Sequence, residues 1–110
     1  MAWDQAMCAA AAHPGAEVSE PFGPGVRVWK VGGKIFAAIS DQGVCVKCEG
    51  IPEARMLIDL GLAARAPYFH ASWVLVPFDG PGAATVETRI AASYARIRSA
   101  LPRALLEALG

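Results

Sequence analysis

Hydrophobic residues recur with the period of a helix near the start of the chain. Residues 3–12 are rich in alanine, which has the highest helix propensity. An apolar stripe with helical spacing runs along this segment and consists of Trp3, Ala6, Met7 and Ala10. Pro14-Gly15 cannot continue a helix, so the pattern predicts a helix over residues 3–12 with one buried face.

The pattern then changes to one that is typical of strands. Residues 26–31 mix β-branched, aromatic and basic side chains, as strands of a partly exposed sheet do. Segments 35–40 and 44–48 continue this pattern, and Gly32-Gly33 joins the first two segments because both positions of a tight hairpin turn accept positive φ. We therefore expect a three-stranded meander, preceded by the turn-rich stretch Pro21–Gly25.

A second helix and two further strands are predicted next. Pro52 suits the first turn of a helix that ends near Leu60, because Gly61 is a typical residue after a helix end. A short edge strand at 66–69 and a final strand at 73–78 follow.

The last long helix starts near Ala84, and Pro102 ends it. Its apolar face consists of Ile90, Tyr94, Ile97 and Leu101. Leu105, Leu106 and Leu109 mark a short closing turn or helix. The order αβββαββα predicts an α+β fold in which helices cover one face of an antiparallel sheet, as a two-layer α/β sandwich and a single domain over residues 1–110.

Composition sets broad limits. With 110 residues, of which 55% are hydrophobic, the chain can bury a core without a disulfide or a metal. No apolar run reaches the roughly 18 residues that span a bilayer, so we expect a cytoplasmic protein with no membrane partner. The cysteines Cys8, Cys45 and Cys48 are odd in number, which suits a reducing compartment. A monomer is expected, with a dimer through the uncovered sheet face as the alternative.

Charge restricts the kinds of partner. Ten basic residues balance ten acidic ones, so the formal net charge is zero. A nucleic-acid binder has either an overall basic excess or a concentrated basic face. The composition removes the first possibility and leaves only the second.

Several segments together resemble the MmcQ/YjbR family from about Pro14 to Leu106. They are Pro14-Gly15 after the first helix, the Phe22-Gly23 turn, the hairpin from Val28 to Ala37, the third-strand pattern Val46-Lys47-Cys48, Trp73 at the start of the last strand, Asp79-Gly80, Ser93-Tyr94 and Leu101-Pro102. The resemblance implies a frataxin-like α/β sandwich and DNA binding through a double wing, in which two hairpins hold the duplex. Many members carry Lys or Arg just before the tryptophan, where this chain has His70-Ala71-Ser72.

A basic set follows from the meander and from this resemblance. Arg27, Lys30, Lys34 and Lys47 could converge on the first wing and contact DNA phosphates, with His70 on the second wing. Binding would be weak and salt-sensitive, with a log–log salt slope of roughly −4 for four to five phosphate contacts. The alternative interpretation is a solvated sheet face with lysines that protect its edges.

The remaining arginines and the cysteines are better explained by structural roles than by catalysis or metal binding. The last helix region carries Arg89, Arg96, Arg98 and Arg103 against a single Glu87, and positive charge near a helix C-terminus is favourable. Cys45 and Cys48 form a single C-x-x-C without the further ligands of a zinc site, and they are expected to be buried small side chains. We therefore predict no enzyme activity, no catalytic residues, no metal and no cofactor.

Two expectations remain beside these. The aromatic residues Phe36, Tyr68 and Trp73 are expected in the core. The alternative function is a protein–protein or small-ligand binding module of the same fold without DNA affinity.

Overall fold

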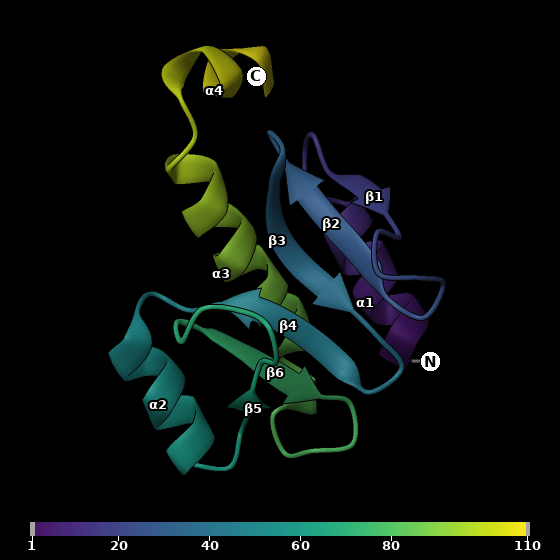
Figure 1. The fold of residues 1–110 in the computed structure, drawn as a ribbon, viewed down its shortest axis with the longest axis vertical. Helices are drawn as coiled ribbons and strands as arrows, with labels where there is room; N and C mark the ends of the chain where they lie inside the picture. Colours follow the sequence, from purple (N-terminus) through teal and green to yellow (C-terminus); the bar gives the residue numbers. More distant parts are fainter. Residues whose placement is uncertain (1, 110) are drawn as a thin grey trace.

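The computed structural model describes residues 2–109, in which helices and an antiparallel sheet form two layers (Figure 1). The strands are β1 (Glu17–Ser19), β2 (Arg27–Val31), β3 (Lys34–Ile39), β4 (Gly43–Lys47), β5 (Ala64–Arg65) and β6 (Trp73–Pro77). The helices are α1 (Ala2–Ala11), α2 (Ile51–Asp59), the 3-10 turn η1 (Ala83–Thr85), α3 (Val86–Ser99) and α4 (Arg103–Leu109). The α+β two-layer fold class is therefore confirmed.

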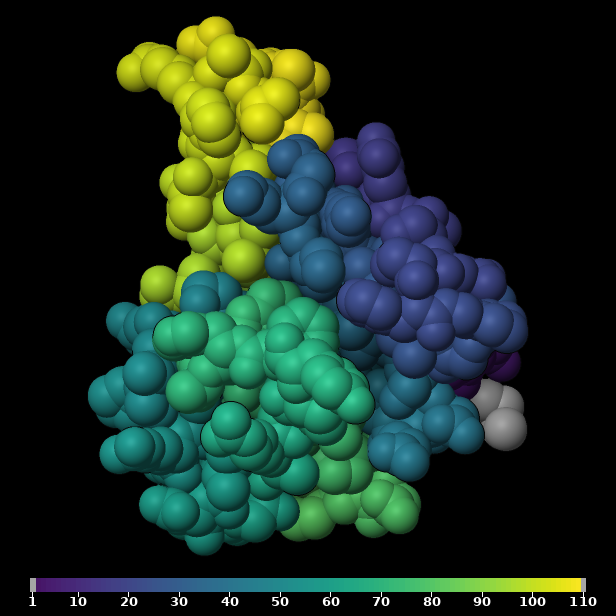
Figure 2. Space-filling view, viewed as in Figure 1, coloured from purple at the N-terminus to yellow at the C-terminus, as the bar shows by residue number. Residues whose placement is uncertain are grey.

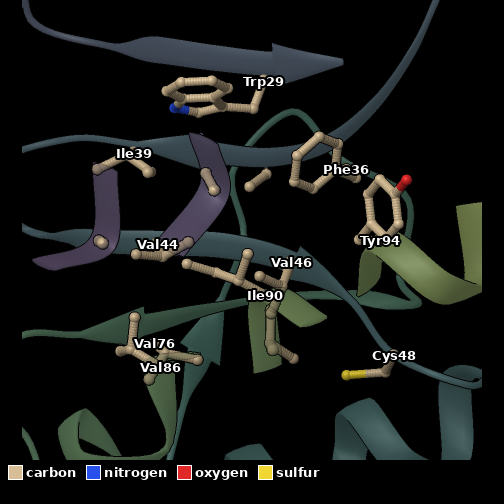
Figure 3. Packing of buried hydrophobic residues seen from close by; sticks show 14 of the residues in the cluster. Trp29, Phe36, Ile39, Val44, Val46, Cys48, Val76, Val86, Ile90 and Tyr94 are labelled. Carbon is tan, nitrogen blue, oxygen red and sulfur yellow. The ribbon is translucent and has the colours of Figure 1, made fainter. Parts of the chain in front are cut away.

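The sheet has the strand order β1-β2-β3-β4-β6-β5, and each neighbouring pair is antiparallel. Helices α1 and α3 pack against each other and against β3, while α2 packs beside β5 and β6. The core between the layers includes Ile39, Val44, Val46, Val76 and Ile90, which Figure 3 shows converging from the strands and from α3. Burial of these aliphatic side chains supplies the main driving force for this arrangement.

A β-bulge in β3 turns an aromatic side chain toward the helices. Trp29 lies opposite Ala37 and Lys30 lies opposite Ile35, so β3 has one extra residue, Phe36. The Phe36 ring is fully buried and packs edge-on against the ring of Tyr94, with a centroid distance of 5.2 Å. This contact packs β3 against α3.

Most of the predicted elements are confirmed, with bounds shifted by one residue for the first helix, the meander and the final strand. The apolar stripe of α1 packs inward through Ala6 and Ala10, and that of α3 through Ile90 and Tyr94. Leu101, which was predicted on the same helix face, is buried but lies beyond the end of α3 at Ser99. The closing helix is confirmed as α4, although it begins at Arg103.

Three expectations differ from the structure. Strand β1 was not predicted, because its three residues are too few to show a strand pattern and all of them are exposed. The edge strand lies at Ala64–Arg65 rather than at 66–69, because Pro67 and Tyr68 form a turn. Tyr68 is fully exposed with a positive φ of 69°, so its placement in the core was wrong, whereas Phe36 and Trp73 are buried as expected.

Candidate nucleic-acid interface

All three lysines of the chain line the same open pocket, whose volume is about 510 Å³. They are Lys30 on β2, Lys34 at the start of β3 and Lys47 at the end of β4. No acidic residue lines this pocket. A chain with zero net charge therefore concentrates its lysines at one place, which we call the lysine pocket.

The lysine pocket lies where three parts of the chain meet. The β2–β3 hairpin forms one side, the loop of residues 66–72 and the start of β6 form the second, and the end of α3 closes the third. Figure 2 shows the hairpin in blue, the loop in green and α3 in yellow-green meeting on one face of the molecule. Apolar side chains such as Ile35, Trp73 and Leu101 supply the rest of its lining.

A buried serine explains why the sheet opens at this point. The pairing of β3 with β4 extends only to Ala37 opposite Val46. Beyond this pair, the Lys47 amide donates a hydrogen bond to Ser93 Oγ at 2.9 Å, and the Ser93 hydroxyl donates to the Phe36 carbonyl oxygen at 2.6 Å. Ser93 thus replaces a direct strand–strand hydrogen bond, so β3 and β4 diverge and leave room for the pocket.

Two side chains of the loop hold the Lys47 ammonium in place. Lys47 Nζ donates a hydrogen bond to Ser72 Oγ at 2.7 Å, and Ser72 Oγ lies 2.9 Å from His70 Nδ1. The Ser72 amide also donates to His70 Nδ1 at 3.1 Å, so this nitrogen acts as an acceptor. His70 does not line the pocket. It contacts Ser72, which in turn accepts the hydrogen bond from Lys47.

Arg27 lies apart from the lysines. Its guanidinium forms an ion pair with Glu20 at 2.7 Å and donates a hydrogen bond to the Pro24 carbonyl at 2.8 Å. It also lies over the ring of Trp3, 5.8 Å from the centroid. Arg27 begins β2 and Lys30 lies near the end of the strand, so the structure places Arg27 at the opposite end of β2 from the pocket.

Aromatic residues that the sequence analysis did not assign to the site form one wall of the pocket. Phe69 stacks on Trp73 with a centroid distance of 4.5 Å and an interplanar angle of 25°, and both residues line the pocket. The Phe69 amide lies 3.5 Å from the Ala66 carbonyl, which closes a turn with Pro67 at its second position. The signal that could have found this wall is the run Pro67-Tyr68-Phe69, since proline at that position predicts a turn.

One acid lies near the lysines without joining the pocket. Glu17 on β1 is the register partner of Lys30, but it does not line the pocket. Within residues 2–109 the ion pairs all involve arginines. The ammonium groups of Lys30 and Lys34 are therefore not neutralised by a carboxylate in the described part of the chain.

The model of the YjbR family matches residues 11–96, most of the chain. The chain belongs to the YjbR family. A crystal structure of a Deinococcus radiodurans protein with a DUF419 domain superposes with a TM-score of 0.81 and 21% identity, over 97% of this chain and 86% of that one. No curated protein matches the chain.

The arginines of α3 in this YjbR domain pair with acids near α2. Arg89 lies 3.6 Å from Glu53, and Arg96 lies 3.8 Å from Glu49. Together with Lys47 these residues line a second pocket of about 360 Å³, in which the charges are mixed. These ion pairs balance the charges in this second pocket, whereas the lysine pocket carries positive charges alone.

Cys48 is buried as expected, whereas Cys45 is only partly buried. Burial raises the pKa of Cys45 to about 11, and it raises the pKa of Cys48 as well, with a further contribution from the nearby Glu53 carboxylate. Among residues 2–109, no three His, Cys, Asp or Glu side chains lie together in a way that could hold a metal ion. No helix in that range is long and apolar enough to cross a membrane.

Proposed function

We propose that this YjbR domain is a non-enzymatic protein that binds DNA weakly and in a salt-sensitive way through the lysine pocket. The observation that carries the proposal is that Lys30, Lys34 and Lys47 are the only lysines of the chain and line one pocket without an acid. Lysine ammonium groups bind phosphates as point charges and supply the sequence-independent part of DNA affinity. The β2–β3 hairpin is then the first wing, and the loop of residues 66–72 is the second.

The number of lysines sets the expected strength of binding. Each phosphate contact on duplex DNA contributes about −0.9 to the log–log salt slope, so three lysines give about −2.7. The slope is shallower than the value of roughly −4 expected from the sequence, because Arg27 is engaged with Glu20 and His70 does not line the pocket. Between about 50 and 200 mM salt we expect the affinity to fall about 40-fold.

The non-enzymatic part of the proposal rests on the serine–histidine contact near the pocket. Ser72 Oγ lies within hydrogen-bond distance of His70 Nδ1, as in a nucleophile with its base. However, Ser72 is only 3% exposed, and its oxygen already accepts a hydrogen bond from Lys47. A substrate cannot reach a hydroxyl that is buried and engaged in this way, so we assign the contact a supporting role.

Fluorescence anisotropy of a labelled random duplex, titrated with protein at several salt concentrations, tests the proposal. The informative variants are Lys34→Glu and Arg55→Glu, because both residues are exposed and both substitutions change the net charge equally. We expect Lys34→Glu to weaken binding and reduce the slope by about 0.9, and Lys30→Glu/Lys34→Glu to abolish binding. Arg55→Glu leaves both quantities close to wild type. Equal losses in the two single variants, or no binding of the wild type at low salt, would refute the proposal.

One observation favours the alternative of a protein-binding module. The outer side of α2 exposes Met56 and the following Leu60 by 49% and 64%, and with Ile51 they line an open pocket of about 470 Å³. Apolar side chains gathered in this way are typical of protein–protein contacts. Sedimentation of the chain over a range of concentrations tests self-association through this side, with Met56→Glu/Leu60→Glu as the variant that abolishes it. A monomer at all concentrations removes this form of the alternative.

A further inference from the structure

The loop of residues 66–72 contains an aromatic side chain, that of Tyr68, which is not packed against the rest of the described chain. Tyr68 is fully exposed, so its ring packs against nothing in the described chain. Its φ of 69° lies in the left-handed region, which residues other than glycine, asparagine and aspartate rarely adopt. The turn from Ala66 to Phe69 places Tyr68 at its third position, where glycine is usual when φ is positive. The ring is therefore presented to solvent at a cost in backbone conformation.

The neighbouring rings line the lysine pocket. Phe69 follows Tyr68 directly and stacks on Trp73, and both Phe69 and Trp73 belong to the pocket wall. The opposite rim carries Lys30 and Lys34, and Lys47 is held beside Trp73 by its register in the sheet and by Ser72. Flat apolar surfaces thus lie next to positive charges inside a space of about 510 Å³, which falls in the roughly 300–1,000 Å³ range of ligand pockets.

This combination fits one chemical class. Proteins that bind single strands combine aromatic rings, on which bases stack, with basic groups that follow the phosphates. A base in a duplex is already stacked and paired, and it enters a pocket only if it is flipped out at a cost in energy. We propose that the lysine pocket receives an unpaired base of single-stranded DNA, with Tyr68 as a further stacking surface and the three lysines on the flanking phosphates. This inference rests on the proposed DNA binding and specifies the form of DNA that the same site prefers.

The test compares three labelled probes of equal length: a single strand, the corresponding duplex, and an abasic single strand. Anisotropy titrations at one low salt concentration are made with wild type, Tyr68→Gly and Phe22→Ala. Glycine keeps the positive φ of the turn, so Tyr68→Gly removes the ring without disturbing the loop. Phe22 is the matched control, because it is an aromatic residue 69% exposed in a turn that does not line the pocket.

We expect the single strand with bases to bind more tightly than the duplex. We also expect it to bind more tightly than the abasic single strand. Loss of the Tyr68 ring lowers single-strand affinity about tenfold, which is the effect of one stacked base. Duplex affinity stays within about twofold, and Phe22→Ala leaves all affinities unchanged.

The outcomes separate the two proposals. If the duplex and both single strands bind equally and the lysine variants abolish binding of all three, the lysine pocket binds phosphates alone. Stacking is then overturned, and the proposed function stands. If no probe binds, both proposals fail. If Tyr68→Gly and Phe22→Ala lower single-strand affinity equally, the role of Tyr68 is refuted.

Discussion

Replacement of Ser93 by alanine tests how the structure forms the opening between β3 and β4. Ser93 is fully buried, and its hydroxyl bridges the Lys47 amide and the Phe36 carbonyl. Alanine fits the space but pairs with neither group. The variant therefore leaves one carbonyl and one amide of the main chain without their partner.

The expected cost follows from these two groups. A buried polar group without a partner costs about 1–3 kcal/mol. Phe36 is fully buried and its carbonyl takes the full cost, whereas Lys47 is only partly buried and its amide takes the lower value. The higher helix propensity of alanine offsets about 0.5 kcal/mol. The free energy of unfolding therefore falls by about 3.5 kcal/mol.

Thermal and urea denaturation measure this loss. For a chain of 110 residues, 1 kcal/mol corresponds to about 4 °C in Tm, so we expect a decrease of about 14 °C. Ser99→Ala is the matched control, because Ser99 lies on the same helix but is exposed and bonds only to the Arg96 carbonyl. We expect this control to change stability by less than about 0.5 kcal/mol. Equal and small effects of the two substitutions would refute the bridging role of Ser93.

Further predictions concern reactivity, pH and packing. At about pH 8, DTNB labels the exposed Cys8 well before Cys45, whose pKa burial raises to about 11; equal rates would contradict this. Burial lowers the pKa of His13 from 6.5, so folding favours the neutral ring. The free energy of unfolding therefore keeps its full value above pH 6.5 and falls as the pH drops through that value, because the unfolded chain then binds a proton more readily than the folded one. Thermal denaturation at different pH values detects the decrease, which His13→Phe reduces. Gly43→Ala places a Cβ 2.2 Å from a main-chain carbonyl oxygen and lowers the free energy of unfolding, measured by urea denaturation, by about 2 kcal/mol or more, whereas Gly25→Ala meets no atom and is close to neutral.

The helices and the meander could be predicted because their periods follow directly from the apolar positions. The stripe through Ala6 and Ala10 faces the core, and the Gly32-Gly33 turn joins β2 and β3 as expected. The same turn brings Lys30 and Lys34 together at one end of the hairpin. Local signals of this kind do not depend on the rest of the fold.

The remainder depends on tertiary contacts that the sequence does not display. A strand rises about 3.3 Å per residue, so Arg27 lies about 10 Å from Lys30 along β2 and finds Glu20 instead. Ser93 resembles any polar helix residue until α3 packs between Lys47 and Phe36. The positive φ of Tyr68 was not predictable, because no glycine marks that position.

An NMR titration of the isotope-labelled protein with a short single-stranded DNA tests the role of the lysine pocket most directly, because it locates the contact residue by residue. We predict that the largest shifts in the amide signals occur at Lys30, Lys34, Lys47 and in the loop of residues 66–72. We predict that signals from α2 and from Arg27 stay in place. Shifts concentrated on α2 or around Arg27, or no shifts at a DNA concentration well above about 10⁻⁴ M, would contradict the assignment of this pocket as the DNA site.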